Sequence, residues 1–425
     1  MELLQIKKEI QESRLDQTLG LLYGEATVHA QRKRYLDALN AFAQLYGGGD
    51  VQILSVPGRS EIGGNHTDHN HGRVLACAVD LDVIAVARKS GNTQIRLQSE
   101  GFGMDKLSIQ TLRPVENEHF TSKALIRGTA ARLQTLGYTV GGFDAYITSN
   151  VLKGSGLSSS AAFEVMCANI FSHLFNGGKI DTVTMAKTGQ YAKREFFGKP
   201  CGLMDQMASA VGGFISIDFA DPENPLVQKI DLDMAQTGYT LCIIDTAGNH
   251  ADLNADYASI QSEMKAVATL LGHTVLRKCN EEQFFTRLPE IRAKLGDRAV
   301  LRALHFFGDN ARVSGEVEAL RSGNFQAFLN LVIQSGRSSF QYLQNVYSIQ
   351  DPRQQGLSLA LALSEKILEK NGAWRVHGGG FAGTIQAFVP NKPADVYTAE
   401  MNRVFGEHAC YRLRVRPVGA VRVSE

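Results

Sequence analysis

The sequence lacks a net charge of either sign. It contains 44 Lys and Arg residues against 43 Asp and Glu residues, which leaves a formal charge of +1 over 425 residues. A broad surface that binds nucleic acid or another large polyanion needs a clear excess of basic residues. The balance therefore argues against nucleic acid as a partner, although it leaves room for a local basic patch.

Cysteine is scarce, and long apolar runs are missing. The six cysteines are scattered, with no CxxC pair and no zinc-ribbon spacing, which fits a reducing compartment. The most apolar stretch, residues 74–87, is interrupted by Asp80 and Asp82 and is too short to span a bilayer. The first residues lack the apolar core of a signal peptide. We therefore expect a cytoplasmic protein with no membrane partner.

Glycine, in contrast, is abundant. There are 41 glycines, about 10% of the chain against a usual share of about 7%. An excess without collagen periodicity or low complexity indicates loops where the backbone turns sharply or touches a ligand. The length predicts two domains, perhaps three, and the 44% hydrophobic and 20% charged content is that of a globular protein.

Strand and helix patterns mix along the chain without a regular βαβ rhythm, which favours an α+β fold over a doubly wound one. No internal repeat or linker-like run occurs, so we expect a compact domain boundary near residues 210–235. Apolar spacing predicts two or three helices within residues 1–46, further helices over 123–136 and 161–174, and a mostly helical region over 258–343. The predicted strands cover 51–56, 74–87, 93–98, 143–148, 214–217, 240–244, 383–388 and 411–415.

A glycine- and serine-rich loop lies between a predicted strand and an apolar helix. Glycines allow the backbone to approach an anion, the helix N-terminus offers unpaired N–H groups, and hydroxyls can contact phosphate oxygens or a metal. The spacing is that of neither a P-loop nor a Rossmann turn. A flexible turn with a serine N-cap is the plainer alternative, but three consecutive serines favour phosphate binding. The loop residues are Gly154, Ser155, Gly156, Leu157, Ser158, Ser159 and Ser160.

The segment 57–72 is almost entirely polar or glycine and directly follows a predicted strand. It could be a long surface loop. It could also bind a transition metal through His66, Asp68, His69 and His71. In an extended segment, however, the first two face one way and the last two the other, so they would not converge. Donors and acceptors aimed at a polyol suit these residue types better.

Two further segments attract attention. Four glycines follow Arg375 and His377 within six residues, which indicates a loop packed against a ligand or another loop, or an ordinary glycine-rich turn. Asp205 lies in a mostly apolar stretch. Burying an unpaired carboxylate destabilises a protein by several kcal/mol, on the order of the loss of a buried ion pair. We therefore expect Asp205 to be paired. Arg59 is an attractive partner for it, either in a structural ion pair or in an active site.

The order and spacing of these four segments resemble the galactokinase family of the GHMP small-molecule kinases. The family pattern GRxNLIGEHTDYNxG aligns without a gap with residues 58–72, PxGxGLSSSAA with 152–162, CGxMDQ with 201–206, and RMTGGGFGG with 375–383. The resemblance covers most of the chain from about residue 50 onward. The first 45 or so residues match nothing in it.

The resemblance implies an α+β, two-lobed GHMP kinase fold. An N-lobe related to ribosomal protein S5 domain 2 would occupy residues 1–220, and a ferredoxin-like C-lobe residues 221–425. The last strand would pair back onto the N-lobe, and the site would lie in the cleft between the lobes.

The resemblance also implies an activity, the ATP-dependent phosphorylation of the anomeric C1 hydroxyl of a monosaccharide, most simply galactose. The expected partners are a small-molecule sugar and ATP, and the expected assembly is a monomer or weak dimer. Asp205 would be the catalytic carboxylate, with Arg59 beside it, and Ser159 would lie near Mg²⁺. The implied sugar contacts are Asn65, His66, Asp68 and Tyr257, and the implied nucleotide contacts are Gly154 to Ser160 with Gly379 and Gly380.

The chain departs from the family pattern at informative positions. Asn65 replaces a glutamate that faces the far end of the sugar, which could admit a sugar acid such as galacturonate, and Glu61 replaces an asparagine. Lys193 stands where a magnesium-ligating glutamate is expected, and Glu195 lies roughly 200° further around a helix. A kinase for a related sugar and a non-catalytic sugar- and ATP-binding regulator therefore remain alternatives to a galactose kinase.

Overall fold

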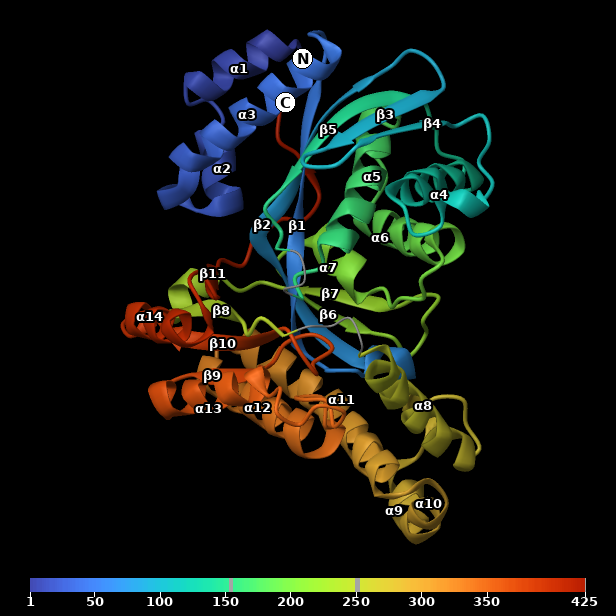
Figure 1. Cartoon of the computed structure of the whole chain (residues 1–425), viewed down its shortest axis with the longest axis vertical. Helices are drawn as coiled ribbons and strands as arrows, with labels where there is room; N and C mark the ends of the chain where they lie inside the picture. The colour runs from blue at the N-terminus through green and yellow to red at the C-terminus, as the bar shows by residue number, and fades with distance from the viewer. Residues whose placement is uncertain (153–155, 249–252, 425) are drawn as a thin grey trace.

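The computed structural model describes residues 1–152, 156–248 and 253–424, which form two lobes of mixed helix and sheet (Figure 1). The predicted α+β class is confirmed, because among the described residues all strand pairs except β3 with β5 are antiparallel and the helices do not form a regular βαβ series. The N-lobe forms the upper part of the molecule in Figure 1, and the C-lobe lies below it.

The N-lobe is built on a sheet in which β12, β1, β2, β5, β3 and β4 lie side by side, with β6 and β7 continuing from β2. The long strand β2 pairs with β6 through its first half and with β5 through its second half. The strands are β1 (Gln52–Gly63), β2 (Arg73–Lys89), β3 (Gln94–Ser99), β4 (Met104–Ser108), β5 (Phe143–Ser149), β6 (Phe214–Asp218), β7 (Leu226–Ile230) and β12 (Val421–Arg422).

Both faces of this sheet are covered by helices, because both faces of its central strands are apolar. Ile53 and Ile84 pack with the N-terminal helices, whereas their neighbours Leu54 and Ala85 pack with the helices on the opposite face. This is the period of two that a strand imposes. The covering helices are α1 (Leu3–Gln11), α2 (Asp16–Tyr23) and α3 (Val28–Tyr46) on one face, and α4 (Ser122–Thr135), α5 (Ser159–Phe175), α6 (Thr182–Tyr191) and α7 (Met204–Val211) on the other.

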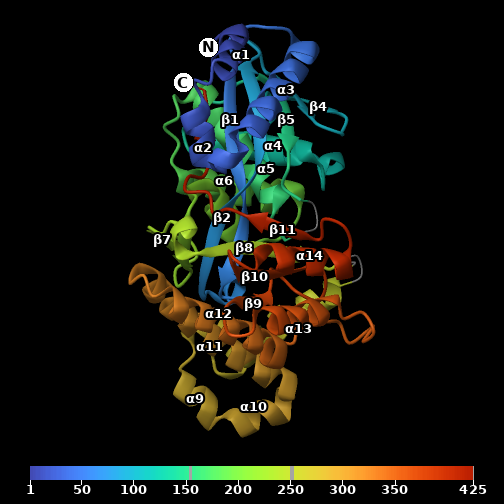
Figure 2. The same ribbon diagram turned by 90° about the vertical axis from the view of Figure 1, so that its left-hand side faces the viewer.

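The first 46 residues, which the resemblance left unexplained, are tied to the sheet by a buried carboxylate. Asp82 is fully buried and accepts hydrogen bonds from Tyr23 Oη and Arg34 Nη1, each at 2.5 Å. The Arg416 guanidinium lies 3.3 Å from the same carboxylate. One aspartate of β2 therefore joins the N-terminal helices to the C-terminal segment, and both termini lie at the same end of the molecule (Figure 2).

Strand β1 corrects the prediction of a short strand followed by a long polar loop. Pairing with β2 continues through Arg59 and Glu61 to Gly63, with register shifts at two places. Both polar side chains are buried, and each meets a partner of opposite charge, Asp205 and Arg375 respectively. The polar run therefore marks buried ion pairs on a strand, whereas the prediction took it to be a loop with donors and acceptors aimed at a polyol.

The C-lobe has an antiparallel sheet in the order β11, β8, β10, β9, covered by helices. The mostly helical region predicted over 258–343 is confirmed. The strands are β8 (Tyr239–Asp245), β9 (Ala373–Val376), β10 (Thr384–Pro390) and β11 (Cys410–Leu413). The helices are α8 (Asn254–Leu270), α9 (Glu281–Thr286), α10 (Leu288–Leu295), α11 (Asp297–Arg321), α12 (Phe325–Ser338), α13 (Gly356–Leu368) and α14 (Ala394–Phe405).

The N-lobe sheet includes strands from both sides of the C-lobe in the sequence. Strand β7, which follows the predicted boundary at residue 220, still pairs with β6 of the larger sheet. At the other end, β12 returns to pair with β1, and Val415 bridges to Val79. The larger sheet therefore includes residues on both sides of the C-lobe.

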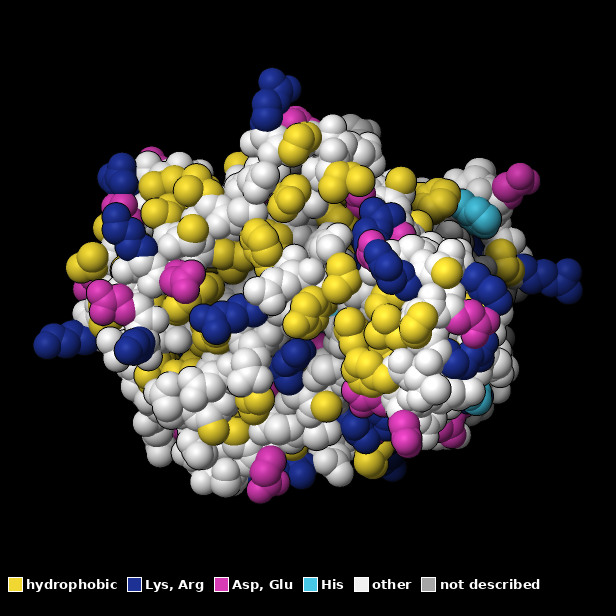
Figure 3. Space-filling view, turned by 90° about the horizontal axis from the view of Figure 1, so that it is seen from below, with side chains coloured by type: hydrophobic (Ala, Val, Ile, Leu, Met, Phe, Trp, Pro, Cys, Tyr) yellow, Lys and Arg dark blue, Asp and Glu magenta, His cyan; other side chains and the backbone are white. Residues whose placement is uncertain are grey.

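The surface agrees with the balanced charge of the sequence. On the face in Figure 3, which is seen from below, basic and acidic side chains are interspersed with apolar and neutral ones. Among the described helices, none combines the length and the apolar character needed to cross a membrane.

Candidate active site between the lobes

Asp205 and Arg59 meet at the centre of the N-lobe site. Asp205 is in the first turn of α7 and Arg59 is on β1. Arg59 Nε lies 2.8 Å and Nη2 2.7 Å from Asp205 Oδ1, which confirms the predicted pairing. Ser158 Oγ donates to Asp205 Oδ2 at 2.7 Å. The aspartate side chain keeps 29% of its surface exposed, whereas the arginine keeps 8%.

The pair fixes the protonation state of Asp205. Burial acts to raise the pKa of this carboxyl, but the Arg59 guanidinium and the Ser158 hydroxyl outweigh it, so the pKa lies below its usual value. The carboxylate is therefore ionised at neutral pH, as a proton acceptor must be.

The serine loop lies beside this carboxylate. Gly154 and Ser155 fall outside the described residues. Ser158, at the N-cap position of α5, has a left-handed backbone (φ 58°). Its hydroxyl donates to Asp205, so the first N–H groups of α5 have no side-chain cap. Such a helix start attracts anions. Backbone atoms of Gly156 and Leu157 accept hydrogen bonds from Arg59, which locks the loop to β1.

A cavity of about 550 Å³ opens at the start of α5, within the range of small-molecule sites. Ser159 and Ser160 line it together with apolar side chains and with polar ones that include Glu100 and Asp105. The apolar side chains include Phe102, Phe120, Ile147, Val151 and Phe163.

Two of the predicted sugar contacts, Asp68 and His66, lie in the segment that follows β1. A Cβ on Gly202 would stand 2.4 Å from Asp68 Oδ2, so only glycine permits Asp68 to approach the segment that leads into α7. Burial, and then Asp205, raise the pKa of Asp68. His66 has a left-handed backbone (φ 57°), and burial lowers its pKa to about 4, so its ring is neutral at pH 7.

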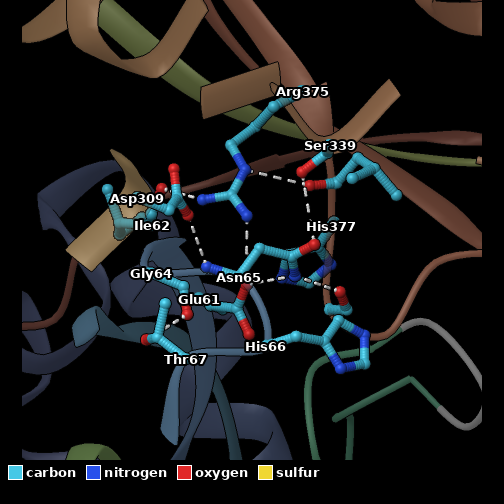
Figure 4. A network of polar contacts seen from close by, with 12 residues as sticks. Glu61, Ile62, Gly64, Asn65, His66, Thr67, Asp309, Ser339, Arg375 and His377 are labelled. Carbon is cyan, nitrogen blue, oxygen red and sulfur yellow. Dashed lines mark hydrogen bonds and ion pairs between the residues drawn. The ribbon is translucent and has the colours of Figure 1, made fainter. Parts of the chain in front are cut away.

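Asn65 is placed differently from its neighbours. Its side chain is fully buried at the junction of the lobes, where Nδ2 donates to Glu61 Oε1 at 2.8 Å and to the Gly378 carbonyl at 2.6 Å (Figure 4). Its Oδ1 accepts from Asn345 Nδ2 at 2.8 Å. The protein itself thus uses this amide, and the sugar contact implied by the resemblance stays a prediction.

The third glycine segment packs on the sugar side of the site. His66 Nε2 lies 2.9 Å from the Gly379 carbonyl, and Tyr257 Oη donates to the Gly380 carbonyl at 2.8 Å. A Cβ on Gly379 would stand 2.6 Å from the Tyr257 ring. Tyr257 is thereby brought to the predicted sugar residues, whereas nucleotide contacts by Gly379 and Gly380 stay predictions.

Polar side chains of the C-lobe helix α11 complete the junction, and the sequence patterns gave no role to them. Asp309 accepts the backbone N–H of Asn65 at 2.8 Å, and a ring nitrogen of His305 lies 2.9 Å from the Asn65 carbonyl. Both side chains are fully buried, as are those of Arg302 and Glu316 on the same helix. Buried polar residues in a predicted helix were the only available signal.

Comparison with known proteins identifies the family. Residues 40–89 match the galactokinase galactose-binding signature, and residues 124–213 match the GHMP kinases N terminal domain. A galactokinase of Glaesserella parasuis serovar 5 is 31% identical over 360 residues, which is 83% of this chain and 89% of that protein. The chain belongs to the galactokinase family. A galactokinase of Actinobacillus pleuropneumoniae serotype 5b is 29% identical over 83% of this chain and 89% of its own length.

Solved structures confirm the two-lobed GHMP kinase fold. The Lactococcus lactis galactokinase complexed with galactose superimposes with a TM-score of 0.77 at 23% identity, over 91% of this chain and all of that one. The Methanococcus jannaschii mevalonate kinase superimposes with a TM-score of 0.61 at 15% identity, over 86% of this chain and 99% of that one. As a member of a kinase family, the chain uses ATP.

The magnesium ligands implied by the galactokinase resemblance are a poor fit here. Mg²⁺ binds through oxygen ligands, usually including carboxylates. Asp205 is paired with Arg59, and Glu164 with Lys193 at 3.0 Å. Glu100 and Asp105 also line the cavity with Ser159 and Ser160, where they accept hydrogen bonds from Thr148 and Ser122. The described residues also contain no cluster of three or more His, Cys, Asp or Glu side chains suited to a metal. A metal contact by Ser159 stays a prediction.

Proposed function

We propose that this galactokinase-family chain transfers the γ-phosphoryl group of ATP to the anomeric C1 hydroxyl of galactose. The observation that supports this most directly is the Asp205 carboxylate, which is ionised, partly exposed, and held by Arg59 and Ser158. It lies between the uncapped start of α5 and the Asp68 segment, which is where a sugar hydroxyl and a phosphate would meet.

The transfer then follows from the geometry. Asp205 accepts the proton of the C1 hydroxyl as its oxygen attacks the γ-phosphorus. The new bond joins O1 to phosphorus, the bond between the γ-phosphorus and the bridging oxygen breaks, and ADP leaves with that oxygen. Arg59 keeps Asp205 ionised before transfer and offsets the negative charge that develops during it.

The nucleotide would lie along α5. The phosphates would accept from the N–H groups of its first turn and from the Ser159 and Ser160 hydroxyls. The base and ribose would occupy the 550 Å³ cavity next to these serines. Its aromatic and aliphatic wall suits a planar base.

The sugar would be bound by His66, Asp68 and Tyr257, none of which lines that cavity. Galacturonate was an alternative because Asn65 removes a negative charge. The Glu61 carboxylate, 2.8 Å from the Asn65 amide, returns that charge to the same network. The argument for a sugar acid therefore loses its basis, and galactose is the simpler substrate.

A phosphorylation panel tests this proposal. Purified protein with Mg-ATP is incubated with galactose, galacturonate, arabinose or N-acetylgalactosamine. ADP release gives the rate, and phosphorus NMR shows which hydroxyl has been phosphorylated. We expect galactose 1-phosphate as the preferred product. The absence of phosphate transfer to every sugar, together with a thermal shift by galactose, would instead support the sugar-binding regulator.

A further inference from the structure

Lys193 occupies an unusual position for a lysine. It lies in a π-helical segment, Ala192–Phe197, that directly follows α6, and only 10% of its side chain is exposed. Its Nζ lies 3.0 Å from Glu164 Oε1 and donates to Ser160 Oγ at 3.1 Å. Ser160 is itself exposed and lines the proposed nucleotide cavity. The ammonium thus reaches the place where the phosphates would enter.

The ammonium is charged in this setting. Burial acts to lower the pKa of Lys193, but the Glu164 carboxylate more than offsets it, so the pKa lies above the usual value. Glu164 is fully buried and also accepts from Gln206 Nε2 at 2.6 Å, which fixes the carboxylate in place. An ammonium has three N–H donors, and among the described residues Glu164 and Ser160 account for two of them. A third donor is available to an anion.

We propose that Lys193 binds the triphosphate of ATP directly and takes the place of a protein-bound divalent cation. The proposal rests on the proposed function only for the identity of the nucleotide. It draws on the serine-lined cavity, the uncapped start of α5, and the pairing of Asp205 and Glu164 with basic side chains. A carboxylate at position 193 would need a metal between itself and a phosphate, whereas an ammonium needs none.

A dependence of ATP binding on magnesium tests the proposal without measuring turnover. The affinity of a non-hydrolysable ATP analogue is measured by calorimetry in EDTA and in 5 mM Mg²⁺. For the unmodified protein we expect the two affinities to agree within about threefold. Lys193→Gln should weaken binding in EDTA on the order of 10- to 100-fold, the usual effect of a lost hydrogen bond to a charged group. Lys193→Arg should retain most of the affinity.

A paired variant separates phosphate binding from a purely structural role. Lys193→Gln alone leaves Glu164 buried without a cation and could impair folding. Glu164→Gln combined with Lys193→Gln removes both charges and leaves a neutral hydrogen-bonded pair. We expect this double variant to fold and to show the same loss of nucleotide affinity as Lys193→Gln. If it binds as tightly as the unmodified protein, the ion pair is only structural and the proposal is overturned.

A second control addresses general electrostatics. Lys187 on α6 loses the same charge in Lys187→Gln, but its Nζ contacts the Glu223 carbonyl, away from the serines. We expect no change in nucleotide affinity for this variant. An equal loss in Lys187→Gln and Lys193→Gln would overturn the proposal, as would an unmodified protein that binds the analogue only with Mg²⁺. A protein that phosphorylates no sugar but passes these tests contradicts the proposed function and leaves the role of Lys193 standing.

Discussion

Exchanging Glu61 and Asn65 is the sharpest test of how the two lobes are joined (Figure 4). Glu61 Oε1 contacts both the Asn65 amide, at 2.8 Å, and the fully buried Arg375 guanidinium, at 3.1 Å. The family pattern has an amide at position 61 and a carboxylate at position 65. This chain has the two groups the other way round, so the network keeps one carboxylate and one amide.

Each single substitution should destabilise the protein strongly. Glu61→Asn leaves Arg375 buried without a carboxylate, which typically costs about 3–5 kcal/mol. Asn65→Glu places a second carboxylate beside Glu61. Two such charges about 4 Å apart repel by about 4 kcal/mol at an effective dielectric constant near 20. The combined variant again contains one carboxylate and one amide, so it should lose far less than the sum of about 8 kcal/mol.

The assay is urea denaturation of the four proteins followed by circular dichroism. We expect a coupling free energy of several kcal/mol between the two sites. Gln5 and Glu9 form an exposed amide–carboxylate pair with the same four-residue spacing, at 3.0 Å. Exchanging them should change the stability by less than about 0.5 kcal/mol. Additive single effects at positions 61 and 65 would refute the reasoning.

Three further predictions concern buried charge. Glu316 is fully buried, and both of its carboxylate oxygens lack a hydrogen-bond partner among the described residues. Burial raises its pKa to about 8. Because the unfolded chain loses this proton at lower pH than the folded one, the stability of the protein should fall as pH rises from about 4.5 to 8. Glu316→Gln should therefore raise the melting temperature at pH 8.5, whereas Glu318→Gln, exposed on the same helix, should not. His66 has a pKa of about 4 in the folded protein and about 6.5 in the unfolded chain, so the stability of the protein should fall as pH drops from 6.5 to 4. The melting temperature of His66→Gln should fall less over this range, whereas that of His408→Gln, which changes an exposed histidine, should fall as in the unmodified protein. Asp82→Asn leaves Arg34 and Arg416 without their carboxylate and should cost about 3–5 kcal/mol, with faster tryptic cleavage within the first 46 residues as the direct readout.

Local pattern was enough to predict most of the fold and the centre of the site. The predicted helices and strands follow from apolar periodicity, since nothing in the tertiary structure opposes it in those segments. Helices α6, α7, α13 and α14 and the short strands β4, β7, β9 and β12 were not predicted. Asp205 and Arg59 were also predictable as a pair, because a carboxylate in an apolar stretch must find a cation. The structure brings them together across 146 residues of chain.

The remainder depended on contacts that sequence patterns do not contain. The end of β1 was predicted to be a loop because the charged partners of its polar residues, Asp205 in α7 and Arg375 in the C-lobe, lie far away in the sequence. Asn65 was expected to face a sugar, yet its amide donates a hydrogen bond to the carboxylate of Glu61, four residues earlier in the chain. The departure at Lys193 was visible in the sequence, but its pairing with Glu164 on α5 depends on how the tertiary structure places the π-helical segment.

The rate of phosphate transfer to galactose by Asp205→Asn tests the central claim most directly. The amide preserves the shape of the side chain but cannot accept the C1 hydroxyl proton. We predict that kcat falls on the order of 10²- to 10⁴-fold, as when a general base is lost, while galactose and ATP still raise the melting temperature. An unchanged kcat for galactose 1-phosphate formation would contradict the account.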